Sequence, residues 1–429
     1  MTVTSRVPGL VLTDHEFAVP LDRARPDGPQ ITVYAREVVA PRKEHDDLPW
    51  LVFLQGGPGG KSPRPTEPGD WLGRALEDYR VLLLDQRGTG RSSPATRQTL
   101  AGLGTAAAQA DYLRHFRADA IVADAEHIRS RLLGPEGRWS LLGQSYGGFC
   151  VLTYLSMAPD GVREALVTGG LPPLEASIDE IYRATYRRVL DRNRRYYLRY
   201  PDDVERARSV VDHLMERDVR LPSGDPLPAA RFQQLGMSFG MHDGFERLHY
   251  LLEEAFVDGP AGAELSDTFL TGVEQAVSFA TNPLYAVLHE AAYCQGTASH
   301  WSAERLRAEH PQFEVTGTEP VFFTGEMIYP WMFDADRALR PLQGAAEILA
   351  SVESWPPLYD VERLRANPVP LAAAVYSDDM YVERDFSEQT ARTVAGTRTW
   401  VTNEYDHDGL RVHGGTVLGH LIEMVRGER

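Results

Sequence analysis

The sequence predicts an α/β fold in which a mostly parallel sheet flanked by helices is interrupted by an inserted helical cap domain. Three observations lead to this prediction. Up to about residue 170, strand-like and helix-like segments alternate, as in successive βαβ units. The pattern is then mainly helical to about residue 366, and strand-like segments return afterwards. We therefore expect a discontinuous α/β core over residues 1–170 and 367–429 and a helical domain over residues 171–366.

The expected strands of the first part are short apolar runs. Residues 31–39 are rich in β-branched side chains, and residues 50–54, 79–84 and 139–142 are continuous apolar runs. Such runs are typical of strands that are buried on both faces of a parallel sheet. Between them, residues 118–133 place apolar side chains at helical spacing, which predicts a crossover helix.

The remaining elements follow in chain order. Long stretches rich in arginine, glutamate and leucine over residues 181–200 and 243–256 predict helices of the inserted domain. Residues 371–376 and 398–402 then read as strands, and residues 415–426 as a closing helix. These late strands complete the sheet that the first part begins.

Composition and charge exclude several classes of protein. The chain has 429 residues, of which 43% are apolar and 24% are charged, as expected of a folded globular protein. Its net charge of −17 opposes binding to nucleic acid or to an anionic membrane. No signal peptide and no apolar run long enough to span a membrane is visible, so we expect a cytoplasmic protein. The sequence does not indicate an oligomeric state.

The two cysteines, Cys150 and Cys294, lie too far apart in the chain to suggest a metal site, and two cysteines do not make a disulfide framework. No other metal-ligand spacing or phosphate-binding loop is apparent. We therefore expect neither a metal nor a cofactor.

The motif Gly-x-Ser-x-Gly, which can carry a nucleophilic serine, occurs twice. One copy contains Ser145 and the other contains Ser238. The chemistry requires a sharp turn from a strand to a helix, which projects the serine from the edge of a sheet. Ser145 follows the expected strand 139–142, whereas Ser238 lies inside the helical segment without a strand before it. We therefore predict Ser145 as the nucleophile.

A glycine-rich run, residues 55–60, follows the expected strand 50–54. An α/β-hydrolase needs a loop at this place in the fold, because a backbone N–H from it helps to bind the oxyanion of the reaction. Glycine lets that N–H approach a substrate carbonyl closely. The sequence therefore predicts an oxyanion hole formed by the backbone N–H groups of Gly57 and Tyr146.

The acid and the base of a catalytic triad are expected on loops that follow late strands, in the order serine, acid, histidine. The strand 371–376 is followed by Asp378 and Asp379, and the strand 398–402 by a loop that contains His407. His413 and His420 are the nearest competitors, but they lie in or near the closing helix. We predict His407 as the base, while the spacing alone leaves Asp378 and Asp379 as alternatives for the acid.

Three motifs in this order resemble the prolyl aminopeptidases, or proline iminopeptidases, of the α/β-hydrolase superfamily. They are the glycine-rich run 56–60, the sequence Asp-Gln-Arg-Gly-Thr-Gly-Arg-Ser at 85–92, and the run 143–148 around the predicted nucleophile. The resemblance extends to the loops of Asp379 and His407 and so covers most of the chain. The usual histidine before the glycine-rich run is replaced by Gln55.

The resemblance implies a serine aminopeptidase that releases an N-terminal residue, preferably proline, from a small peptide or amide with a free N-terminus, without a metal. In this family an apolar pair follows the acid, which favours Asp379 over Asp378. The family's cap carries glutamates that bind the substrate's α-amino group, and Glu290 and Glu326 fit this role. A charged amine in a partly closed pocket needs such anionic partners.

Three alternatives remain at this point. A small-acyl esterase or amidase and an aminopeptidase of broader specificity share the same fold and triad, because these do not determine the substrate. A binding protein built on an inactive hydrolase scaffold is the third alternative, which the complete set of serine, acid, histidine and glycine-rich loop argues against.

Overall fold

The central sheet is mixed, with a large parallel part. The computed structural model describes residues 3–260, 262–317 and 319–429, and within them nine strands pair in the order β1-β2-β3-β5-β4-β6-β7-β10-β11. These strands are β1 (Val3–Val7), β2 (Leu10–Pro20), β3 (Gln30–Val39), β4 (Trp50–Leu54), β5 (Arg80–Leu84), β6 (Trp139–Gln144), β7 (Val162–Thr168), β10 (Leu371–Tyr376) and β11 (Thr397–Thr402). The first three pair antiparallel, as do β3 and β5, and all pairs from β5 to β11 are parallel.

Parallel pairing determines where a site can form. The register aligns Leu54 of β4 with Gly143 of β6, and Gln144 of β6 with Thr168 of β7. The carboxyl ends of β4, β6, β10 and β11 therefore meet at one edge of the sheet. In open α/β sheets, ligands bind in the crevice outside this edge.

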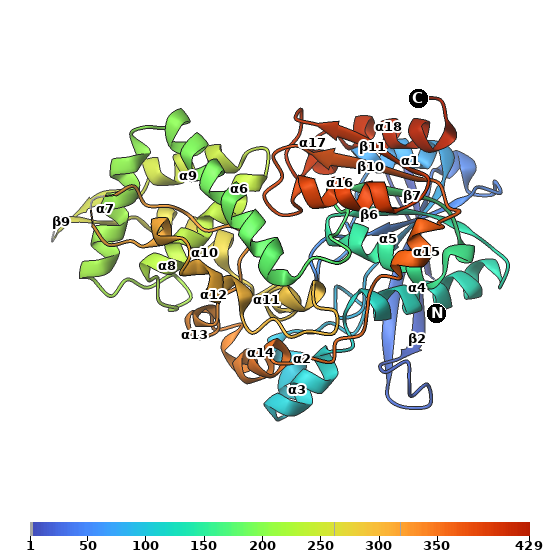
Figure 1. Cartoon of the computed structure of the whole chain (residues 1–429), viewed down its shortest axis with the longest axis horizontal. Coiled ribbons are helices and arrows are strands. Elements are labelled where there is room, and N and C mark those ends of the chain that lie inside the picture. The colour runs from blue at the N-terminus through green and yellow to red at the C-terminus, as the bar shows by residue number, and fades with distance from the viewer. Residues whose placement is uncertain (1–2, 261, 318) are drawn as a thin grey trace.

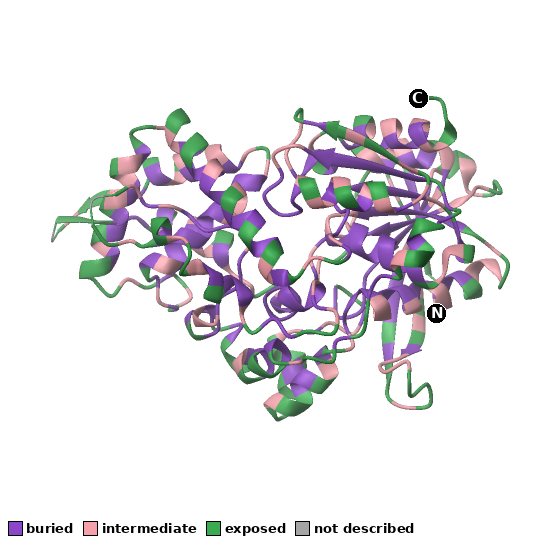
Figure 2. Cartoon of the chain, in the orientation of Figure 1, coloured by how far each residue is buried: buried purple, intermediate pink, exposed green. Residues whose placement is uncertain are grey.

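Helices cover both faces of the sheet (Figure 1). One face carries α1 (Asp70–Asp78) and α18 (Gly414–Arg426), which pack on each other and bury a cluster of leucine and valine side chains. The other face carries α4 (Ala118–Leu133), α5 (Tyr146–Met157) and α16 (Arg384–Thr393). Residues of the central strands are buried along their length (Figure 2), because neither face of the sheet meets solvent.

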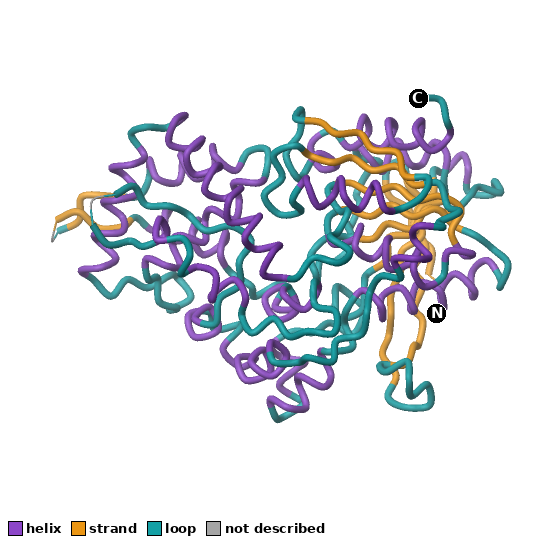
Figure 3. The backbone as a smooth tube through the Cα atoms, viewed as in Figure 1, coloured by secondary structure: helices purple, strands orange, loops and turns teal. Residues whose placement is uncertain are grey.

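The chain between β7 and β10 leaves the sheet, and we call residues 171–366 the cap segment. It is mostly helical and lies beside the sheet (Figure 3). Its helices are α6 (Ile178–Arg199), α7 (Asp203–Glu216), α8 (Ala229–Gln233), α9 (Gly244–Glu253), α10 (Asp267–Val277), α11 (Pro283–Leu288), α12 (Ser302–Arg307), α13 (Trp331–Ala335), α14 (Gln343–Ala350) and α15 (Val361–Arg365).

Helices α2 (Arg97–Ala101) and α3 (Ala106–Leu113) precede the cap segment in the chain but lie against it, with α3 packed on α14 (Figure 1), and α17 (Gly409–Val412) packs on α18.

The expected strands and helices are confirmed where apolar side chains dominate the pattern. Strand β4 and helix α4 span the expected residues, and β5, β6, β10 and β11 agree to within two residues. The antiparallel strands β1 and β2 and the small hairpin of β8 (Phe256–Gly259) and β9 (Gly262–Leu265) were not expected. The side chains of β1, β8 and β9 are largely exposed, so no apolar run marks these strands, whereas β2 is partly buried.

Within the described residues, none of the helices has the length and apolar character that crossing a membrane requires.

Candidate active site

Ser145 lies at the turn from β6 into α5, with backbone angles of φ 55° and ψ −125°. This region of φ favours glycine, so a serine here is strained. The turn is held because the N–H of Ser145 donates to the carbonyl of Thr168 at 2.9 Å. A Cβ at Gly147 would lie 1.9 Å from the carbonyl oxygen of Leu54, so only glycine permits this approach of α5 to β4. The strand-to-helix turn expected around Ser145 is therefore present.

The glycine-rich run after β4 lies against the serine. A Cβ at Gly56 would lie 3.0 Å from the Cβ of Ser145, which shows how closely the two turns approach. Gly57 has φ 146° and so presents its backbone in a conformation that other residues rarely adopt. Tyr146 is the first residue of α5, and its N–H has no acceptor within the helix. Gly57 and Tyr146 line the same cavity as Ser145, so their N–H groups remain the candidates for an oxyanion hole.

Asp379 and His407 form a buried pair on the loops that follow β10 and β11. The Nδ1 of His407 lies 2.7 Å from Oδ2 of Asp379, and the two residues are 4% and 1% exposed. The other oxygen, Oδ1, accepts hydrogen bonds from the N–H groups of Tyr381 at 2.8 Å and Val382 at 3.0 Å. Burial lowers the pKa of His407, but the carboxylates of Asp379, Glu326 and Asp408 together raise it more, and the pKa lies above its ordinary value. The pair can therefore take up a proton.

His407 and Ser145 both lie close to the turn that follows β7. A Cβ at Gly169 would lie 3.1 Å from Nδ1 of His407, and a Cβ at Gly170 would lie 2.4 Å from the carbonyl oxygen of Ser145. These two glycines directly follow β7, the strand between β6 and β10. The order of strands thus brings the loops of Asp379 and His407 and the turn of Ser145 to the same edge of the sheet from distant parts of the sequence.

The competing candidates lie elsewhere. Asp378 turns its side chain, 38% exposed, to Arg195 at 2.7 Å. Ser238 donates its hydroxyl hydrogen to the carbonyl of Leu235 at 2.8 Å, which is a local packing role. His420 stacks on Trp400 with ring centroids 4.1 Å apart. His413 lies at the N-terminus of α18, where its ring is 5.5 Å from that of Tyr405.

A narrow cavity of about 10 Å³ lies beside Ser145. Both expected oxyanion-hole residues line this cavity, and so do Ser145 and Glu326. The lining residues are Gly57, Pro58, Ser145, Tyr146, Phe149, His289, Ala292, Tyr293, Glu326 and Val382. The walls are thus mostly apolar, with one carboxyl group near the nucleophile.

Glu326 belongs to the cap segment. Its side chain is partly buried and lines the cavity. The hydroxyl group of Tyr285 donates a hydrogen bond to its Oε1. Burial raises the pKa of Glu326 to about 7, while the Tyr285 hydrogen bond and the charge of His407 act in the opposite direction. A cationic group in the cavity would favour the ionised carboxylate.

Glu290 lies apart from this cavity. Its Oε1 accepts a hydrogen bond from the N–H of Ala303 at 3.0 Å, and its Oε2 accepts one from the N–H of Ser302 at 3.3 Å. These are the first residues of α12, whose N–H groups have no partner within the helix. Burial raises the pKa of Glu290, and these backbone hydrogen bonds oppose the shift. The structure places this carboxylate at the N-terminus of α12, and Glu290 is not among the described residues that line the cavity.

Three further cavity residues were not expected from the sequence. Phe149 and Tyr293 pack edge to face, with ring centroids 5.3 Å apart, and form an apolar wall. His289 is buried, and burial lowers its pKa to about 4, so the ring is neutral at neutral pH. Its Nδ1 has no hydrogen-bond partner among the described residues. No local motif marks these residues, because only the fold brings them to Ser145.

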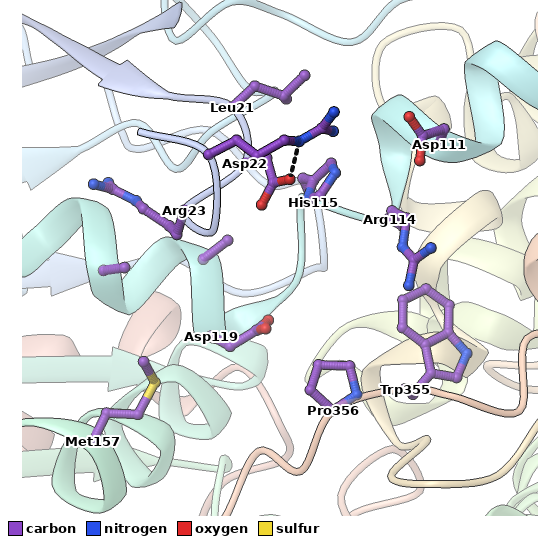
Figure 4. A pocket seen from close by; sticks show the side chains of 13 residues that line it. Leu21, Asp22, Arg23, Asp111, Arg114, His115, Asp119, Met157, Trp355 and Pro356 are labelled. Atoms are coloured by element: carbon purple, nitrogen blue, oxygen red, sulfur yellow. Dashed lines mark hydrogen bonds and ion pairs between the residues drawn. The ribbon is translucent and has the colours of Figure 1, made fainter. Parts of the chain in front are cut away.

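A larger cavity lies between the loop after β2, helices α3 and α4, and Trp355 (Figure 4). It contains charged side chains of both signs, and Asp22 pairs there with Arg25 at 2.7 Å. Ser145 and His407 are not among its lining residues within the described chain. Its size therefore does not make it a candidate for nucleophilic chemistry.

Among the described residues, no group of three or more histidine, cysteine, aspartate or glutamate side chains is arranged to hold a metal ion. The chemistry that this arrangement can perform is nucleophilic attack by a hydroxyl group on an acyl carbon. His407 would accept the proton, and two N–H groups would receive the developing negative charge.

Comparisons with known proteins agree with this chemistry. Residues 49–408 match the family model described as the alpha/beta hydrolase fold. The chain is 50% identical over 419 residues to the proline iminopeptidase of Aeromonas sobria, with 97% of each chain covered. It is 36% identical over 425 residues to the proline iminopeptidase aneH of Aspergillus aculeatus, with 97% of this chain and 94% of that one covered.

Solved structures are more distant. Rv0554 from Mycobacterium tuberculosis superposes with a TM-score of 0.45 at 13% identity, covering 96% of this chain and 99% of that one. A thermophilic esterase from Thermogutta terrifontis gives a TM-score of 0.41 at 14% identity, covering 96% and 98%. Neither likeness bears on the substrate.

Proposed function

The chain belongs to the proline iminopeptidases of the α/β-hydrolase family, and on this premise we propose that it releases N-terminal proline through a triad of Ser145, His407 and Asp379. The hydroxyl of Ser145 attacks the carbonyl carbon of the terminal residue while His407 accepts its proton. The imidazolium then returns that proton to the leaving amine, and an acyl-enzyme remains. Water attacks the acyl-enzyme by the same route and frees the amino acid.

The Asp379 carboxylate keeps the imidazole in one orientation and stabilises its charged form. This role needs a short, buried hydrogen bond, and the distance of 2.7 Å between Nδ1 and Oδ2 supports it. The N–H groups of Gly57 and Tyr146 would bind the oxyanion of each tetrahedral intermediate. Losing one such donor lowers the rate on the order of a hundredfold to a thousandfold in comparable sites.

The observation that carries the proposal is the presence of Glu326 in the same cavity as Ser145. A free N-terminal amine is positively charged at neutral pH, and a carboxylate in a largely apolar pocket is a strong partner for it. A charge-assisted hydrogen bond contributes roughly 1.5 to 3 kcal/mol. An N-acylated substrate lacks the charge and would leave the buried carboxyl group without a partner, so the site discriminates against it.

The apolar wall of Phe149, Tyr293 and Val382 suits a pyrrolidine ring. The cavity, about 10 Å³ in this structure, leaves no passage for a longer chain, and a terminal residue would enter it only as the surrounding side chains move. We assign to the cap segment, residues 171–366, the role of a specificity domain, because it supplies Glu326 and Tyr293 to a nucleophile that belongs to the core. Small peptides or amides with a free N-terminus are the substrate class.

The experiment compares three arylamides, those of proline, alanine and N-acetylproline. We expect the prolyl compound to be cleaved fastest and the acetylated one not to be cleaved. Equal cleavage of free and blocked substrates would exclude amine recognition, and turnover of aryl esters without amide turnover would favour an esterase. Comparable rates for prolyl and alanyl substrates would indicate a broader aminopeptidase.

Ser145→Ala is the matched test of the nucleophile, and Ser238→Ala is its control. Loss of the nucleophile from an intact triad lowers kcat on the order of a millionfold. We expect this loss for Ser145→Ala and wild-type turnover for Ser238→Ala. A fluorophosphonate probe should label Ser145. Full turnover of the first variant would point to another nucleophile or to a protein that only binds its ligand.

A further inference from the structure

Three arginines of α6 lie on one side of the helix. Arg188, Arg192 and Arg195 are spaced by four and three residues, and side chains at this spacing share a helix face. We call them the α6 arginines. Helix α6 belongs to the cap segment, yet all three pair with carboxylates on the loops that follow β10 and β11.

Arg192 makes the most central contacts. Its Nη2 donates to the carbonyl oxygen of Asp378 at 3.0 Å, and the same group forms an ion pair with the carboxylate of Asp406. Asp378 directly precedes Asp379, and Asp406 directly precedes His407. One side chain therefore joins the loop of the acid to the loop of the base.

Of the two flanking pairs, Arg195–Asp378 is the more exposed. Arg188 contacts Glu383 at 2.9 Å, and Glu383 also caps the N-terminus of α16 by accepting from the N–H groups of Asp385 and Phe386. The side chains of Arg188 and Arg195 are 26% and 45% exposed, whereas that of Arg192 is 9% exposed. The exposed Arg195 pair holds its partner weakly, and Arg188 contacts only the loop after β10, so Arg192 is the member that joins both loops.

Stability does not by itself account for this buried pair. Burial raises the pKa of Asp406 despite the nearby Arg192, which indicates that charging the carboxylate there is costly. Buried ion pairs often contribute little net stability compared with apolar side chains of the same size. A planar guanidinium can, however, donate to two acceptors in fixed directions.

We propose that Arg192 is a positioning residue, which joins the loops of Asp379 and His407 from the cap segment and keeps their side chains at hydrogen-bond distance. The inference rests on the triad of the proposed function. It assigns to α6 a part in catalysis that does not require contact with the substrate.

The test compares Arg192→Met with Arg187→Met. Arg187 is exposed on the same helix and has no ion pair among the described residues, so its variant carries the same substitution without the loop contacts. We expect Arg192→Met to lower kcat by about tenfold or more, since small misplacements of catalytic groups reduce rates strongly. The KM for a prolyl arylamide should change less than about threefold, because Arg192 is not among the cavity residues. Arg192→Lys should restore part of kcat.

The pH profile supplies a readout that loss of packing would not change. The charged groups that face His407 or its loop come from both parts of the chain: Asp379, Asp406, Asp408 and Arg411 of the core, and Glu326 and Arg192 of the cap segment. Without Arg192, the Asp406 carboxylate loses its cation and the pKa of His407 rises, so the acidic limb of kcat/KM moves to higher pH. Asp406→Asn leaves Arg192 uncompensated, and the limb should move to lower pH.

Opposite shifts in the two variants would support the positioning role. Wild-type kcat and an unmoved limb in Arg192→Met would overturn it, as would a kcat loss no larger than that of Arg187→Met. If Arg192→Met does not fold, Asp406→Asn tests the positioning role in the same way, by the pH of its acidic kcat/KM limb and by its kcat. Ser145→Ala, measured in parallel, separates the two hypotheses. If Ser145→Ala is active, the proposed triad is wrong. If Ser145→Ala is inactive and Arg192→Met is fully active, only the positioning role is wrong.

Discussion

Nδ1 of His407 donates to Oδ2 of Asp379 across 2.7 Å, and both residues are almost completely buried. The carboxylate is also held by two backbone N–H groups, those of Tyr381 and Val382. Its neighbour Asp378 points away, toward Arg195. Two adjacent aspartates thus have different environments, which allows their roles to be separated experimentally.

Asp379→Asn should abolish most of the activity while the protein stays folded. An amide cannot stabilise the imidazolium and favours the wrong tautomer, so we expect kcat to fall on the order of 10³- to 10⁴-fold. Asp378→Asn removes an exposed ion pair and should lower kcat by less than about tenfold. Steady-state kinetics with a prolyl arylamide measures both, and equal losses would contradict the assignment of Asp379.

Glu326 should give substrate binding a pH dependence near neutrality. Its pKa lies at about 7 in the free enzyme because of burial, so the carboxyl group is neutral at pH 5.5 and ionised at pH 8. Only the ionised form can pair with a substrate ammonium group. We expect KM for a prolyl arylamide to fall between pH 6 and pH 7.5, and we expect Glu326→Gln to remove this dependence and raise KM.

The same carboxyl group should affect stability with a definite sign. Its folded-state pKa is above the ordinary value of 4.5, so its contribution to stability is present below pH 4.5 and is lost as the pH rises to about 7. Glu326→Gln should therefore raise Tm relative to wild type at pH 8 more than at pH 5. Thermal unfolding at the two pH values measures this, and an equal Tm difference at both would contradict the ionisation.

Asn282 connects the cap segment to the glycine-rich loop. Its side chain caps α11 by accepting from the N–H of Tyr285 at 3.2 Å, and its Nδ2 donates to the carbonyl of Pro58 at 3.2 Å. Asn282→Ala should lower stability by about 1 kcal/mol, as loss of a helix cap does. It should also lower kcat by roughly fivefold, because the loop of Gly57 loses a restraint.

Ser266→Ala is the matched control for that variant. Ser266 caps α10 by accepting from the N–H of Phe269 at 3.0 Å, away from the cavity residues. We expect a similar decrease in Tm without a change in kcat. If both variants lose stability and neither loses kcat, Asn282 acts only as a helix cap.

The backbone of Ser145 should be a source of strain that a glycine relieves. With φ 55° and ψ −125°, a residue that has a Cβ is strained by about 1 to 3 kcal/mol. Ser145→Gly should therefore unfold at a higher temperature than Ser145→Ala, although both are inactive. Equal melting temperatures would indicate that the turn relaxes when the hydroxyl group is absent.

Much of the fold could be predicted because its strands are buried on both faces. Strands such as β4 and β10 are continuous apolar runs, and α4 shows a clear helical period. The edge strand β1 has exposed side chains and depends on pairing with β2, so no local pattern reveals it. Continuous apolar runs were thus predicted, whereas strands that mix polar and apolar residues, such as β2 and β7, were missed.

The candidate site likewise contains residues that the sequence predicts and residues that only the structure reveals. Ser145 and His407 follow strands that the sequence predicts, so topology alone places them at one edge of the sheet. The environments of Glu290 and Glu326 could not be distinguished, because they depend on contacts made after folding: one carboxylate accepts from the N-terminus of α12, and the other faces the cavity. His289 adjoins Glu290 in sequence, yet only the structure shows that it reaches the cavity.

The pairing of the α6 arginines with the loops of Asp379 and His407 has a consequence for recombining relatives of this enzyme. A chimera that takes its cap segment from one parent and its core from another would exchange Arg192 without Asp406, or the reverse. Such a hybrid could bind a new substrate and still turn over slowly. If the loops at residues 378–383 and 404–408 are transferred together with α6, the arginines and the carboxylates that they pair with come from the same parent.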